Sequence, residues 1–168
     1  MGRARGPLAG RAWDQSPIAA GDRPPYSLAV VEESDPANRL RSAPREMRAP
    51  VICVVDDDAS ILRALWRLLG AGGFSVETFS SAEGFLESEH RRRADCLVLD
   101  VHLEGMGGLE LQERLLALGM EIPVVFITGH DDRTTRERAG RAGAVGYLRK
   151  PFDDESLIGA INRAIRRG

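Results

Sequence analysis

The chain has 168 residues, of which 43% are hydrophobic and 29% are charged, and its formal net charge is −2. This composition is typical of one globular domain with a tail or of one large domain, and it argues against a strongly basic nucleic-acid-binding surface. No apolar run approaches the roughly 20 residues that a membrane-spanning helix needs, and the N-terminus lacks the apolar segment of a signal peptide.

The first 49 residues differ in composition from the rest. They hold six of the nine prolines and eight of the 22 arginines, and they show little hydrophobic periodicity. Such a segment buries too little apolar surface to offset its ordering entropy. We therefore predict a disordered N-terminal extension over residues 1–49 and a folded domain over residues 50–168. Met47 stands directly before that domain, so an alternative start there is a competing interpretation.

From residue 51 onward, short apolar runs alternate with segments of helical periodicity. The runs predict buried strands, apolar on both sides, and the periodic segments predict helices, of which the fourth has a thin apolar face. Cys53 and Cys96 lie in two of the runs, without CxxC spacing, and are expected to be buried, reduced thiols of a cytoplasmic protein. The expected strands are 51–55, 74–79, 96–101, 122–128 and 144–148, and the expected helices are 60–73, 81–90, 108–119, 131–143 and 153–167.

This alternation predicts an α/β fold, an open parallel sheet with helices on both faces. Ligands of such sheets bind beyond the C-terminal ends of the strands. Four predicted strands end in residues suited to chemistry there, namely Asp56 to Asp58, Asp100, Thr128 and Lys150. Clustered carboxylates call for a cation, and oxygen ligands favour Mg²⁺. A carboxylate beside a metal, a hydroxyl and an ammonium group can accommodate a phosphoryl group.

Four motifs in this order, VVDDD, LVLDVHLEGMGGLEL, VFITGH and GYLRKPF, resemble the receiver domain of two-component response regulators. The resemblance covers about residues 51–167, and the TGHDD stretch is most similar to receivers of the nitrogen-fixation regulator subfamily. It implies a doubly wound, flavodoxin-like sheet of five parallel strands in the order 2-1-3-4-5 with five helices. It also implies phosphorelay signal transduction rather than an enzyme that turns over an external substrate.

The resemblance assigns the acidic residues. Asp100 matches the aspartate that accepts a phosphoryl group from a sensor histidine kinase or a histidine phosphotransfer protein. Asp56 and Asp57 match the pair that holds Mg²⁺, with Asp57 as the direct ligand, and Asp100 and the main-chain carbonyl of His102 complete the metal site. Asp58 is interpreted as a helix N-cap.

The remaining motif residues match the switch machinery. Thr128 matches the hydroxyl that moves toward the phosphoryl group, and Tyr147 matches the aromatic residue that rotates inward on activation. Lys150, the only lysine beside 22 arginines, matches the lysine that contacts the phosphoryl group, and its bond to Pro151 is expected to be cis. A compact ammonium group suits a crowded site better than a planar guanidinium does.

Other interpretations stay open at this point. Thr128 and Tyr147, taken alone, are ordinary strand-end and packing residues. His102 and His130 lack a third partner for zinc, and they occupy variable positions that tune loss of the phosphoryl group. The usual Met-Pro after the acceptor is replaced by Leu103 and Glu104, which puts the stiffness of that loop in doubt. Residues 90–95 are expected to form a solvated loop.

The chain ends directly after the fifth predicted helix, so we expect a single-domain response regulator that contacts a downstream protein and binds neither nucleic acid nor membrane. One alternative is a receiver fragment of a DNA-binding transcriptional regulator. Another is a metal-dependent phosphatase or nucleotide-binding enzyme, although the chain lacks the GxxxxGK[ST] and GxGxxG patterns of nucleotide sites.

Overall fold

The computed structural model of the protein describes residues 48–167. Apart from Arg48 and Ala49, the predicted disordered extension lies outside the described residues, and so does the alternative start at Met47. The division of the chain at residues 49 and 50 therefore stays a prediction. Within the described part, every helix is too short or too polar to cross a bilayer.

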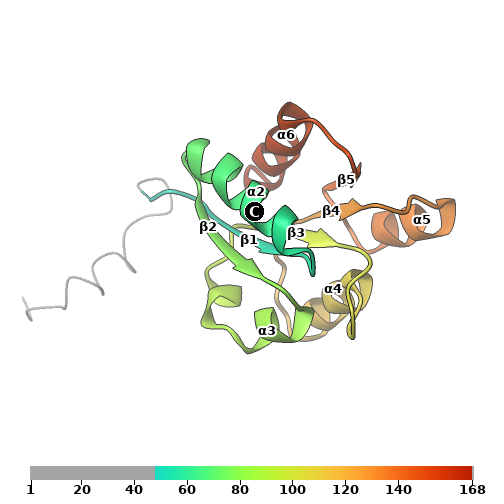
Figure 1. The fold of residues 1–168 in the computed structure, drawn as a ribbon. Coiled ribbons are helices and arrows are strands. Elements are labelled where there is room, and N and C mark those ends of the chain that lie inside the picture. The colour runs from blue at the N-terminus through green and yellow to red at the C-terminus, as the bar shows by residue number, and fades with distance from the viewer. Residues whose placement is uncertain (1–47, 168) are drawn as a thin grey trace, which may run out of the picture. The chain divides into compact units, whose positions relative to one another are not determined.

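Strands and helices alternate along the described chain (Figure 1). The strands are β1 (Val51–Val55), β2 (Ser75–Phe79), β3 (Cys96–Asp100), β4 (Val124–Thr128) and β5 (Gly146–Arg149). The helices are α2 (Ala59–Ala71), α3 (Ala82–Glu87), the 3-10 helix η2 (Glu89–Arg92), α4 (Gly108–Ala117), α5 (Arg133–Arg141) and α6 (Asp154–Ile165). All strands pair in parallel in the order β2-β1-β3-β4-β5, which confirms the predicted sheet and its doubly wound topology.

The central strands alternate between two apolar layers, one on each side of the sheet. Ile52 and Val54 of β1 face a layer that includes residues of α2 and α6, whereas Cys53 and Val55 face one that includes residues of α3, α4 and α5. Figure 1 shows α2 and α6 on one side of the sheet and α3 and α4 on the other. The Cys53 and Cys96 thiols are free and buried, as expected, and burial raises the pKa of each thiol to about 12.

The two edge strands differ from the prediction that every strand is apolar on both sides. In β2, Ser75 and Thr78 are exposed, and in β5 Arg149 is exposed, whereas every residue of β1, β3 and β4 is buried. An edge strand has a neighbouring strand on one side only and is covered less fully by the helices. Its polar residues therefore face solvent without cost.

The segment 90–95 is not a simple solvated loop, which corrects the expectation. Its first residues belong to η2, and Asp95 is only 8% exposed. The Asp95 carboxylate accepts hydrogen bonds from the Val51 amide at 2.8 Å and from the Arg48 guanidinium at 3.0 Å. A buried carboxylate needs such partners. Asp95 thus fixes the chain where it enters β1.

Side-chain caps explain where several helices begin. The Asp58 carboxylate accepts hydrogen bonds from the amides of Ser60 and Ile61, as predicted, and these bonds lower its pKa. Ser81 caps α3 by accepting a hydrogen bond from the amide of Gly84. Such caps satisfy amides that have no partner within the first turn of the helix.

Candidate functional site at the C-terminal edge of the sheet

The chemistry-bearing residues converge where the sequence predicted. Asp56 directly follows β1, Asp100 is the last residue of β3, Thr128 is the last residue of β4, and Lys150 directly follows β5. The strand order makes β1, β3, β4 and β5 successive neighbours. Because all strands run in parallel, these four ends lie along one edge, at the place where the order of strands reverses between β1 and β3.

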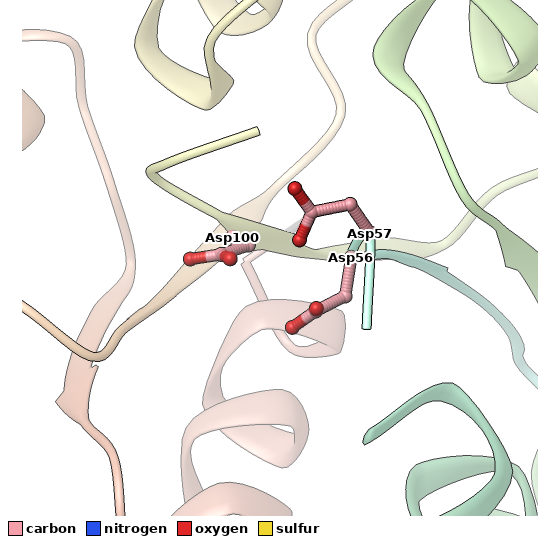
Figure 2. A group of neighbouring side chains, drawn as sticks. All are labelled: Asp56, Asp57 and Asp100. Atoms are coloured by element: carbon pink, nitrogen blue, oxygen red, sulfur yellow. The ribbon is translucent and has the colours of Figure 1, made fainter. Parts of the chain in front are cut away.

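Three carboxylates form the centre of the site. Asp56, Asp57 and Asp100 each offer one oxygen, and these oxygens lie within 4.8 Å of one another. Figure 2 shows the side chains reaching from the ends of β1 and β3 toward a shared space. Asp56 is fully buried and Asp100 is 6% exposed, whereas Asp57 is exposed. This all-oxygen donor set, open to solvent on the Asp57 side, fits a hard divalent cation such as Mg²⁺.

Lys150 reaches the carboxylates from the end of the edge strand β5. Its ammonium nitrogen lies 2.6 Å from an Asp56 oxygen and 3.4 Å from an Asp100 oxygen. Burial alone would lower the pKa of Lys150, but the hydrogen bond that its ammonium group donates to Asp56 and the charges of Asp100 and Asp56 outweigh this effect, and the pKa is raised. The ammonium group therefore stays charged at neutral pH. The Lys150–Pro151 peptide bond is cis, as expected.

Asp100 has a raised pKa, and burial is the main cause. The charge of Lys150 opposes that rise, while the neighbouring carboxylate of Asp56 adds to it. A buried carboxylate is poorly stabilised by solvent when it is ionised. It would gain from a cation placed between it and Asp57.

A short loop connects β3 to α4 and wraps around Asp100. The His102 amide lies 3.4 Å from an Asp100 oxygen, and the Glu104 amide donates to Asp57 at 3.3 Å. Farther along, the Met106 amide donates to the Glu83 carboxylate of α3 at 3.0 Å. These bonds restrain a loop that lacks the usual proline.

Gly108 is required by the close approach of this loop to β3. A Cβ atom at this position would lie 2.1 Å from the main-chain oxygen of Asp100. The Gly108 amide also donates to the Val101 carbonyl at 3.0 Å. Sequence reasoning missed both Gly108 and Glu83; the adjacent glycines 107 and 108 at the start of α4 were the available signal for the first.

Thr128 is fully buried, and its hydroxyl contacts the two histidines of the flanking loops. It donates to the His130 carbonyl at 2.7 Å, and the His130 amide donates back to it at 3.1 Å. Nδ1 of His102 lies 3.2 Å from the same oxygen. The two imidazole rings meet edge to face with their centres 6.3 Å apart. The histidines therefore contact Thr128 rather than forming part of the carboxylate cluster.

Tyr147 lies in β5 beside α5 and is half-buried. Its ring packs under the Arg136 guanidinium, whose carbon lies 5.3 Å from the ring centre, and Arg136 also pairs with Asp131. Burial is the main cause of the raised pKa of the Tyr147 hydroxyl, and the nearby carboxylates of Asp131 and Asp132 add to it. Tyr147 is thus tied to α5, apart from the acidic cluster.

Comparison with known proteins places this geometry in a family. The response regulator receiver domain family matches residues 52–162. The response regulator protein TodT of Pseudomonas putida is 46% identical over 119 residues, which are 71% of this chain and 52% of that protein. The transcriptional regulatory protein FixJ of Bradyrhizobium diazoefficiens is 39% identical over 116 residues, which are 69% of this chain and 57% of that protein. This chain spans about half the length of these curated relatives.

Solved structures agree with the sequence comparison. The response regulator StyR aligns with a TM-score of 0.67 and 45% identity, over 71% of this chain and 60% of StyR. A structure titled FixJ-N aligns with a TM-score of 0.66 and 35% identity, over 73% of this chain and 98% of that one.

Proposed function

This chain belongs to the response regulator receiver domain family, and on that premise we propose that Asp100 accepts a phosphoryl group from a sensor histidine kinase or a histidine phosphotransfer protein. One observation carries the proposal. Asp100 stands at the C-terminal end of the central strand, between two further aspartates and the ammonium group of Lys150. Those neighbours can offset the charge of an incoming phosphoryl group.

In the proposed reaction, a carboxylate oxygen of Asp100 attacks the phosphorus of a phosphohistidine. The phosphorus–nitrogen bond breaks, and its electron pair stays on the partner's imidazole, which takes up a proton. The product is an acyl phosphate on Asp100. The exchange is stoichiometric, so the domain serves as a switch rather than as an enzyme for an external substrate.

A magnesium ion fits the donor set, and Asp56, Asp57, Asp100 and the main-chain carbonyl of His102 would hold it. Bound there, Mg²⁺ would neutralise charge that otherwise repels the phosphoryl oxygens. The protein's own contribution is placement. Lys150 and the Asp58 amide, which donates to Asp56 at 2.9 Å, hold that carboxylate, and Asp57 stays exposed on the open side.

Thr128, Lys150 and Tyr147 are proposed to report the modification. Lys150 lies 3.4 Å from Asp100 and can follow a new phosphoryl oxygen with a small movement. Thr128 would turn its hydroxyl toward that oxygen, and Tyr147 would move inward as Thr128 leaves its resting place. Because Tyr147 packs against Arg136, such a movement would be passed to α5. A downstream protein would recognise the rearranged surface.

The molecule that receives the signal depends on whether this chain is a single-domain regulator or the receiver part of a longer protein. The curated relatives are about twice as long as the matched region, and several are named transcriptional regulators. That favours, as a second candidate, the receiver part of a longer DNA-binding regulator. An antibody raised against residues 50–167 separates the two in cells that express the native gene. A band near 18 kDa, the mass of this chain, supports the single-domain form, and a much larger one supports the alternative.

The direct test is intact-mass measurement after incubation with acetyl phosphate and Mg²⁺. Wild type should gain the mass of one phosphoryl group, and the gain should disappear with a metal chelator. Asp100→Asn should gain nothing, whereas Asp154→Asn, which removes an exposed aspartate of α6, should behave like wild type. An equal gain in Asp100→Asn would contradict the assignment of the acceptor.

A further inference from the structure

The Thr128 hydroxyl has three polar neighbours, and the chemistry of each atom sets the direction of each hydrogen bond. A threonine hydroxyl has one proton to donate and two lone pairs that accept. The His130 carbonyl can only accept, and it lies 2.7 Å away, whereas the His130 amide can only donate. Nδ1 of His102, at 3.2 Å, is the one neighbour that can do either.

The distances decide the role of His102. A separation of 2.7 Å is the usual length of a good O–H···O hydrogen bond, so the Thr128 proton goes to the His130 carbonyl. Nδ1 of His102 must then carry a proton and donate it to the remaining lone pair, because two facing lone pairs would repel. In this arrangement the Thr128 hydroxyl is fully used, and it has no bond left for an oxygen on Asp100.

We propose that the His102 imidazole is a positioning residue that holds Thr128 in its resting arrangement and so sets how readily the domain switches. The inference rests on the proposed function, in which Thr128 turns toward a phosphoryl group on Asp100. It concerns the side chain of His102, not the main-chain carbonyl assigned to the metal. We call the hydrogen bonds that join the Thr128 hydroxyl to His102 and His130 the latch. The latch connects two loops, since His102 follows β3 and His130 follows β4.

The latch has a measurable consequence through linkage. Removing one hydrogen bond from a resting state typically shifts its equilibrium with the switched state by about 2- to 10-fold. A ligand that binds only the switched arrangement has an apparent affinity proportional to the population of that arrangement. Loss of the His102 donor should therefore make a phosphoryl mimic bind more tightly.

The test uses two variants of the same shape. In His102→Asn the side-chain amide nitrogen stands where Nδ1 stood, whereas His102→Leu has the same branching and no donor. Both are titrated with beryllofluoride at saturating Mg²⁺, and backbone amide signals are followed by NMR. The midpoint for His102→Leu should be about 2- to 10-fold lower than that for His102→Asn.

A second pair shows whether the effect acts through the hydroxyl. In a Thr128→Val background, which keeps the side-chain shape and removes the hydroxyl, the asparagine and leucine variants should have equal midpoints. A difference that persists there would overturn the latch, as would equal midpoints in the wild-type background. Failure of wild type to bind beryllofluoride would instead contradict the proposed function.

One further measurement needs no ligand. Nitrogen-15 chemical shifts of the wild-type imidazoles report which nitrogen carries the proton. The latch predicts that His102 is protonated at Nδ1 when its ring is neutral, and that this preference is lost in Thr128→Val. A neutral His102 ring with a bare Nδ1 in wild type would overturn the proposal, whatever the titrations show.

Discussion

Helices α5 and α6 directly precede and follow β5 in the chain, yet they are anchored very differently. Four α6 residues are buried in the apolar layer that they share with α2, namely Leu157, Ala160, Ile161 and Ala164. Helix α5 contributes only Ala139 to the opposite layer. The amount of apolar surface that a helix buries largely determines its local stability.

What holds α5 instead is mostly polar and exposed. Arg138 reaches Glu113 of α4 at 3.4 Å, and the Gln112 amide group donates to the Ala142 carbonyl at 2.7 Å. Exposed ion pairs contribute little to stability. The site therefore has a firmly packed side, which carries the carboxylates that follow β1 and end β3, and a loosely packed side around α5 and Tyr147. The firmly packed side can hold the carboxylates in place while the loosely packed side rearranges.

The largest loss of folding stability is expected from a substitution on the firmly packed side. Leu157→Ala should lower the free energy of unfolding by about 2–5 kcal/mol, because this fully buried side chain leaves a cavity between α6 and the sheet. Chemical denaturation measures it. A loss below about 1 kcal/mol would contradict the claim that apolar packing anchors α6 more firmly than α5.

The next effect concerns the loop that approaches Asp100. Gly108→Ala should lower stability by about 1–3 kcal/mol and slow phosphorylation, because the added Cβ would lie 2.1 Å from the Asp100 carbonyl and would displace the end of β3. Gly140→Ala is the matched control, since its Cβ would meet nothing within 4 Å. Equal behaviour of the two variants in denaturation and intact-mass assays would contradict the role assigned to Gly108.

A smaller effect follows from the raised pKa of Asp100. Burial disfavours its ionised form in the folded state, so ionisation lowers stability as pH rises through the unfolded pKa of about 3.9 toward the higher folded value. Without metal, Asp100→Asn should therefore melt above wild type at neutral pH, and the gap should close at lower pH. Mg²⁺ should stabilise wild type more than the variant. If the variant melts below wild type at neutral pH, ionised Asp100 stabilises the fold, which would contradict this prediction.

The smallest loss of folding stability is expected from a substitution in α5. Arg138→Ala removes an exposed ion pair with Glu113 and should lower stability by less than about 1 kcal/mol. Raising the salt concentration should reduce the difference further. A loss comparable to that of Leu157→Ala would show that polar contacts anchor α5 as firmly as apolar packing anchors α6.

Periodicity was sufficient to predict the alternation of strands and helices, because buried strands and amphipathic helices have distinct spacings. The strand order followed from the resemblance to receiver domains. Parallel topology then brought Asp56, Asp100, Thr128 and Lys150 to one edge. The sequence could not predict the contacts of Gly108 or the bond between His102 and Thr128, because these depend on the path of a loop and on side-chain rotamers. The burial of Asp95 was missed for a related reason, since three preceding arginines suggested a solvated segment.

The most direct test compares hydrogen exchange in unmodified protein and in protein whose modification at Asp100 is quantified by intact mass. Before modification, amides of α5 should exchange faster than those of α6. Modification should change protection mainly from Thr128 to Arg149 and leave α2 and α6 unaltered. Equal protection of α5 and α6, or a confirmed mass gain without a change around α5, would contradict the account.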